Sequence, residues 1–163
     1  MMPQLTSPPW ARTVLICSLV VGVLDGLDAV LFFFYRGVSP SRLFQYIASA
    51  VLGPSTASWG NGAIFLGIAL HFTVAAVLGG VYLGFARLIP WLRTHWVLGG
   101  GAYGLGAYCF INGVVLPLTR AKGAGGWPPT PVLINGVLAH LLLVGLPIGF
   151  VVARAYRAQA KGI

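Results

Sequence analysis

Four long runs of apolar residues dominate this chain of 163 residues. They cover residues 13–35, 61–88, 96–118 and 131–153. Each run is long enough for a helix to cross a hydrocarbon layer about 30 Å thick, at about 1.5 Å per residue. The runs are continuous and do not alternate as barrel strands do, and lipid offers no partners to open strands. The sequence therefore predicts an all-α membrane protein whose four transmembrane helices form an antiparallel bundle.

The composition agrees with a chain that is covered by lipid. Hydrophobic residues make up 58% of the sequence and charged residues only 7%, whereas soluble domains carry about a quarter charged residues. Too few charged side chains are present to cover a surface that faces water. We expect a single transmembrane domain over residues 1–163, with the lipid bilayer as its main partner.

The loop between the first two runs contains a shorter predicted helix. Residues 40–52 begin with a proline that follows Ser39, a favourable N-cap, and they end at Gly53 and Pro54, which stop a helix. A helix of this length cannot span the bilayer. The sequence therefore predicts an interfacial or re-entrant helix in the first outer loop.

The basic residues predict the orientation of the bundle. One side would carry Arg12, Arg87, Arg93, Arg154, Arg157 and Lys161, and the other side Arg36, Arg42, Arg120 and Lys122. The richer side normally faces the cytoplasm, so both termini are expected there. The net charge of +8 then reflects residues that flank the spans and meet anionic headgroups. A nucleic-acid partner is not expected, because no basic soluble face with aromatic residues is visible.

Each of the first three runs contains a glycine pair spaced four residues apart. The pairs are Gly22 and Gly26, Gly80 and Gly84, and Gly100 and Gly104. Small residues at this spacing let helix backbones approach closely in lipid. The pairs predict a tightly packed bundle. The same faces would also suit a homo-oligomer or a subunit of a larger membrane complex, and the sequence leaves these alternatives open.

The only two acidic residues of the chain, Asp25 and Asp28, lie inside the first apolar run. Two aspartates near a helix centre cost about 5–7 kcal/mol on insertion scales, and the apolar residues of the run return a similar amount. This helix is therefore marginal in lipid by itself. Its aspartates share one helix face, and two carboxylates this close resist being ionised together. They must be protonated, paired, hydrated or covered by other helices.

The other apolar runs offer polar partners at a similar depth. His71 and His140 lie near the middle of the second and fourth runs, and Asn112 and Asn135 lie towards the outer side. Counting residues from each midpoint places these groups in one layer with the aspartates, at or above the midplane. No Lys or Arg is expected at that depth.

Three interpretations of this polar layer stay open. The first is a structural cluster of interhelical hydrogen bonds, each worth about 0.6 kcal/mol. The second is a proton or cation site centred on Asp25, Asp28, His71 and His140, because ionisable groups inside a membrane mark such pathways. The third is haem b held between the two histidines.

Part of the chain resembles a known group of membrane proteins. The features are His71–Phe72, Tyr82, the turn at Ile89–Leu92, Pro117 with Leu118, and a histidine in the last run, His140. In these features, residues 71–147 resemble the small bacterial inner-membrane proteins of the YagU type. The resemblance implies a location in the bacterial inner membrane and supplies no active-site residues.

No nucleophile–base motif, zinc-ligand spacing or phosphate-binding loop is present in the sequence. We therefore expect neither an enzymatic activity nor a resident cofactor. The sequence favours a small membrane protein that responds to protons or cations. An accessory subunit of a larger complex and a haem b-binding protein are the alternatives.

Overall fold

The structure is a computed structural model that describes residues 8–121 and 128–161. Four of its helices are long and apolar enough to cross a membrane. They span Trp10–Phe34, Asn61–Leu88, Trp96–Leu118 and Thr130–Ala160. No strand occurs among the described residues. The predicted all-α class is confirmed, and the chain is a multi-pass membrane protein.

The fourth helix is longer than the predicted run and continues seven residues beyond residue 153, to Ala160. Hydropathy marks only the part of a helix that lipid covers. Nothing in this stretch stops the helix, because no Gly or Pro occurs between residue 153 and Ala160. Arg154 and Arg157 lie in the extension. The helix therefore carries these basic side chains past the apolar span.

The first helix, α1 (Trp10–Phe34), and the second long helix, α3 (Asn61–Leu88), pack against each other over an extended contact. The short helix α2 (Pro40–Leu52) packs across the start of α3. The Ser39 side chain accepts a hydrogen bond from the Arg42 N–H, as an N-cap does, and Gly53 ends the helix with φ at +62°. A 3-10 turn at Gly53–Trp59 then leads into α3.

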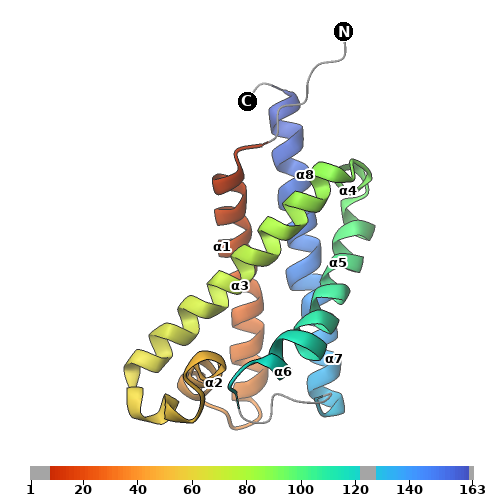
Figure 1. The fold of residues 1–163 in the computed structure, drawn as a ribbon. Coiled ribbons are helices and arrows are strands. Elements are labelled where there is room, and N and C mark those ends of the chain that lie inside the picture. The colour runs from red at the N-terminus through yellow and green to blue at the C-terminus, as the bar shows by residue number, and fades with distance from the viewer. Residues whose placement is uncertain (1–7, 122–127, 162–163) are drawn as a thin grey trace.

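The other two spans form a second closely packed pair. One is α5 (Trp96–Phe110) with its continuations at Ile111–Val115 and α6 (Leu116–Leu118). The other combines α7 (Thr130–Ala139), η3 (His140–Gly145) and α8 (Leu146–Ala160). The one-turn helix α4 (Trp91–Thr94) connects α3 to α5. Figure 1 shows both termini at the end of the bundle that carries α4, and α2 and α6 at the other end.

Glycine permits the close contact between this second pair. A Cβ atom added to Gly100 would lie 2.5 Å from the Gly145 carbonyl oxygen, and one on Gly104 would collide with the His140 carbonyl oxygen. A Cβ on Gly149 would lie 2.6 Å from the carbonyl oxygen of Trp96. The backbones of α5, η3 and α8 therefore touch directly, which only glycine allows.

Two segments depart from α-helical geometry and adopt π-helix, at Ile111–Val115 and at His140–Gly145. Each precedes a proline inside its helix, Pro117 and Pro147. A proline lacks the N–H group, and its ring collides with the carbonyl four residues earlier. That carbonyl falls inside the π segment in both helices. A wider turn relieves the collision while most backbone groups stay hydrogen-bonded in lipid.

Candidate functional site: a polar layer in the bundle

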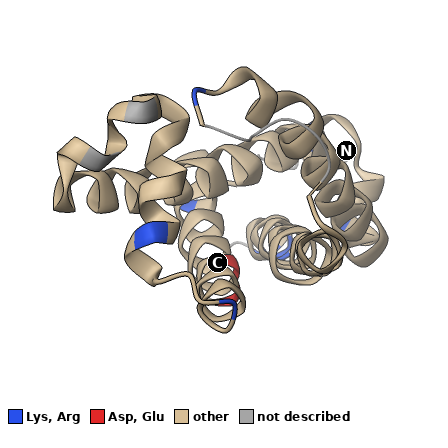
Figure 2. Ribbon diagram, turned by 90° about the horizontal axis from the view of Figure 1, so that it is seen from below, with Lys and Arg blue, Asp and Glu red and all other residues tan. Residues whose placement is uncertain are grey.

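The two aspartates of the polar layer lie on α1, on the side that faces the last span (Figure 2). Asp25 is half-buried there and makes no hydrogen bond or ion pair within the described part of the chain. Its strongest electrostatic neighbour is His140, followed by His71 and Asp28. Two other helices thus each bring an imidazole to the Asp25 carboxyl group, although the two histidines are far from Asp25 in sequence.

His140 is the first residue of the π segment of the fourth helix. A hydrogen bond to the backbone determines which nitrogen of its ring carries the hydrogen. Its Nδ1 atom lies 3.0 Å from the Gly136 carbonyl oxygen. Because a carbonyl oxygen only accepts, Nδ1 carries a hydrogen and donates it. The lone pair of the neutral ring is therefore on Nε2. His140 has one basic nitrogen left for a proton, and Asp25 is its leading electrostatic neighbour.

His71 reaches the layer from α3 and is fixed against α1. Its Nε2 atom lies 2.9 Å from the Gly22 carbonyl oxygen and donates to it by the same reasoning. A Cβ on Gly26 would lie 3.0 Å from this nitrogen. A Cβ on Gly22 would collide with the ring of Phe72, the residue next to His71. The two glycines of α1 therefore make room for two rings of α3, and do not bring two backbones into contact.

Asp28, unlike Asp25, has a hydrogen-bond partner among the described residues. Its Oδ2 atom accepts a hydrogen bond of 2.8 Å from Nδ2 of Asn135, at the start of the fourth span. This bond joins α1 to α7. This hydrogen bond partly offsets the free-energy cost of burying the Asp28 carboxylate in the bundle. Asp25 has no such donor among the described residues. The two aspartates, equivalent in the sequence, are thus chemically distinct in the structure.

Asn112 does not join the layer by hydrogen bonding to another helix. Its amide donates a hydrogen bond of 3.0 Å to the Tyr108 carbonyl oxygen, one turn earlier in its own helix.

A Cβ atom added to either glycine of the remaining pair, Gly80 and Gly84, would make only ordinary contacts of 3.7–3.8 Å with Trp10 and Val14. Of the predicted polar residues, the structure brings together the two aspartates, the two histidines and Asn135.

Tyr108 is a member of the layer that the sequence did not single out. Its ring packs edge-on against the His140 ring, with the centroids 5.1 Å apart. The side chain is 4% exposed, and its hydroxyl group has no hydrogen-bond partner among the described residues. Gly136 makes room for the ring, because a Cβ there would lie 2.5 Å from it. The available signal was a tyrosine one helical turn before Asn112, in the middle of a span.

The described residues contain no group of three His, Cys, Asp or Glu side chains that could hold a metal ion. Among the described residues, the polar layer has one carboxyl without a hydrogen bond, two imidazoles that each keep one basic nitrogen, and one phenol without a partner. Carboxyl and imidazole groups inside a membrane are side chains that can carry protons. The haem b alternative remains a prediction that an absorption spectrum would test.

This chain matches no protein-family model, no curated protein and no solved structure. The resemblance of residues 71–147 to the YagU type therefore stays a prediction. What the polar layer does has to be argued from its own chemistry.

Proposed function

We propose that this chain is a proton-responsive protein of the bacterial inner membrane, in which Asp25 and His140 share one proton near the middle of the bilayer. Two forms of the pair have the same total charge. One has a carboxylic acid and a neutral imidazole, and the other has a carboxylate and an imidazolium. Gain or loss of a proton leaves the pair with a net charge of +1 or −1. Such a change is expensive in lipid and would shift how the helices pack.

The observation that carries this proposal is the isolation of Asp25. A carboxyl group in mid-membrane is costly unless it is neutral or paired. Among the described residues, Asp25 has no hydrogen bond or ion pair, and its leading electrostatic neighbours are two histidines. A role in packing alone would be served by an amide, which carries no ionisation cost.

The distribution of basic residues supports the proposed orientation in the membrane. Arg93 lies on α4, and Arg154 and Arg157 lie near the end of α8. Figure 1 shows α4 and the end of α8 at the end of the bundle where the chain begins and ends. Lys122 lies outside the described residues. The excess of basic residues at that end supports a cytoplasmic position for both termini.

The test compares Asp25→Asn with Asp28→Asn in purified protein reconstituted in lipid. The infrared C=O stretch of a carboxylic acid and the tryptophan fluorescence would be followed from about pH 5 to 8, the range in which histidine titrates. We expect a pH-dependent signal in the wild type that Asp25→Asn removes. Asp28→Asn should retain it, because an amide oxygen still accepts from Asn135.

A second step asks whether the protein conducts protons. Liposomes that contain the protein and a pH-sensitive dye would be given a pH gradient. Dissipation that depends on Asp25 would indicate transfer across the membrane, and a pH signal without dissipation would indicate a sensor. If Asp25→Asn folds normally and keeps the pH signal, the proton proposal is wrong. An accessory subunit that packs through its helix faces would then be the better account.

A further inference from the structure

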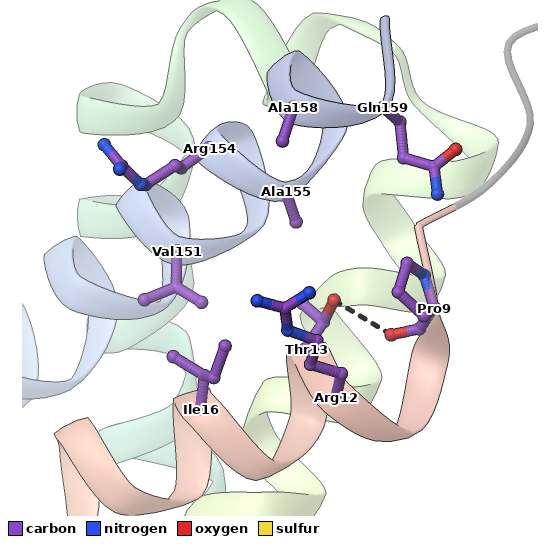
Figure 3. A pocket seen from close by; sticks show the side chains of 9 residues that line it. All are labelled: Pro9, Arg12, Thr13, Ile16, Val151, Arg154, Ala155, Ala158 and Gln159. Atoms are coloured by element: carbon purple, nitrogen blue, oxygen red, sulfur yellow. Dashed lines mark hydrogen bonds between the residues drawn. The ribbon is translucent and has the colours of Figure 1, made fainter. Parts of the chain in front are cut away.

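A groove lies between the start of α1 and the end of α8, far from the polar layer. Its volume is about 360 Å³. Figure 3 shows Arg12 reaching from α1 towards α8, and Arg154 projecting from α8 away from Arg12. The wall between the helices is formed by Ile16, Val151 and Ala155. The groove therefore joins two cationic groups to an apolar surface.

The two arginines of the groove have no anionic partner within the described part of the chain. Neither guanidinium forms a hydrogen bond or ion pair among the described residues. Arg93, by contrast, donates to two backbone carbonyls and lies 4.1 Å from the centre of the Tyr156 ring. Arg157 donates to the carbonyl oxygen of Ala153. Arg12 and Arg154 are thus available to an external anion, and they are the two cations that line the groove.

The depth of the groove identifies the kind of anion. Arg12 precedes Asp25 by thirteen residues, and Arg154 follows His140 by fourteen, so both lie about 20 Å from the polar layer at 1.5 Å per residue. The hydrocarbon core extends about 15 Å from the midplane and the headgroup region to about 20–22 Å. With the layer near the midplane, both guanidinium groups are at the level of the lipid phosphates.

We propose that this groove binds an anionic phospholipid. Arg12 and Arg154 hold the phosphate of its headgroup, since guanidinium groups form paired hydrogen bonds to phosphate oxygens. One acyl chain lies along Ile16 and Val151, towards the middle of the bilayer. Basic pockets between transmembrane helices on the cytoplasmic side are known to bind such headgroups. The inference does not depend on the function of the polar layer.

The experiment measures lipid binding by native mass spectrometry of the full chain released from detergent. Phosphatidylglycerol is titrated into the wild type and into Arg12→Gln, Arg154→Gln and the double variant. Phosphatidylcholine and inorganic phosphate are titrated in parallel. Arg157→Gln is the matched control, because it removes the same charge from the same end of α8 but does not line the groove.

We expect the wild type to retain phosphatidylglycerol in preference to phosphatidylcholine. Each groove substitution should weaken this binding about fivefold and the pair roughly thirtyfold, from the electrostatic contribution of one basic residue near a membrane surface. Arg157→Gln should bind as the wild type does. A thermal melt in detergent should rise with phosphatidylglycerol and fail to rise in the double variant, which also shows whether the variants are folded.

Three results would overturn the proposal. Equal weakening in Arg157→Gln would mean that only overall charge attracts the lipid. Inorganic phosphate that competes fully with the lipid, or raises the melting temperature equally, would assign the groove to a free phosphate. Phosphatidylcholine bound as tightly as phosphatidylglycerol would remove any role for the arginine pair.

Discussion

Replacing Gly104 by alanine tests the contact on which the position of His140 depends. The added Cβ would collide with the His140 carbonyl oxygen and lie 2.9 Å from the Gly145 Cα. Since carbon atoms pack at about 3.5–4.0 Å, this Cα would have to retreat by about 0.6–1.1 Å. Backbone atoms cannot rotate away as a side chain does. The helices must separate, and overpacking of this kind costs about 1–3 kcal/mol.

Gly106 is the matched control on the same helix. It is exposed, and no atom lies within 4 Å of a Cβ added there. Alanine gains up to about 1 kcal/mol over glycine in a helix at either position. This gain cancels in the comparison, so Gly104→Ala should be about 1–3 kcal/mol less stable than Gly106→Ala.

The assay is reversible unfolding in mixed micelles with increasing SDS, which gives the free energy of unfolding of each variant. The pH-dependent signal of the polar layer would be recorded on the same samples. We expect Gly104→Ala to shift that signal and Gly106→Ala to leave it unchanged, because only the first displaces the π segment that carries His140. Equal stabilities for the two variants would refute the assigned backbone contact.

Three further substitutions test other parts of the structure by the same unfolding assay. Asn135→Ala removes the interhelical bond to Asp28 and should cost about 0.6 kcal/mol, and a cost above about 1.7 would show a wider network. Tyr108→Phe removes a buried hydroxyl without a described partner and should raise the free energy of unfolding by about 1 kcal/mol, whereas a decrease would reveal an unseen partner. Gly53→Ala places a side chain at φ +62° and should cost about 1–3 kcal/mol, and an unchanged stability would contradict that backbone conformation.

The sequence was sufficient for the class of fold, because hydrophobicity and helix length are local properties. A span about 20 residues long with almost no charge has few alternatives in lipid. The short helix after α1 was predictable for the same reason, since Ser39, Pro40 and Gly53 act within a few residues of themselves. The proximity of the histidines and Asn135 to the aspartates was also predictable by counting, because a helix rises by a fixed amount per residue.

The roles of individual polar residues were not predictable in this way. Asp25 and Asp28 look equivalent in the sequence, but only Asp28 faces Asn135. The Asn112 amide donates a hydrogen bond within its own helix. Tyr108, which the sequence analysis did not single out, packs against His140 in the layer. These differences depend on how each helix is rotated about its axis. Rotation is set by packing against residues that are distant in sequence, and hydropathy does not encode it.

The sequence alone determined that four helices cross a membrane and that both carboxyl groups lie inside it. The tertiary structure decided that both imidazoles are neighbours of Asp25 whereas Asn135 binds Asp28, and that His140 lies in a π segment before Pro147. It also decided that Arg12 and Arg154 line one groove. The class of fold can be predicted from composition, because the hydrophobic contributions of individual residues add up along the chain. A site depends on the relative rotation and spacing of several helices, which exist only once the bundle has packed.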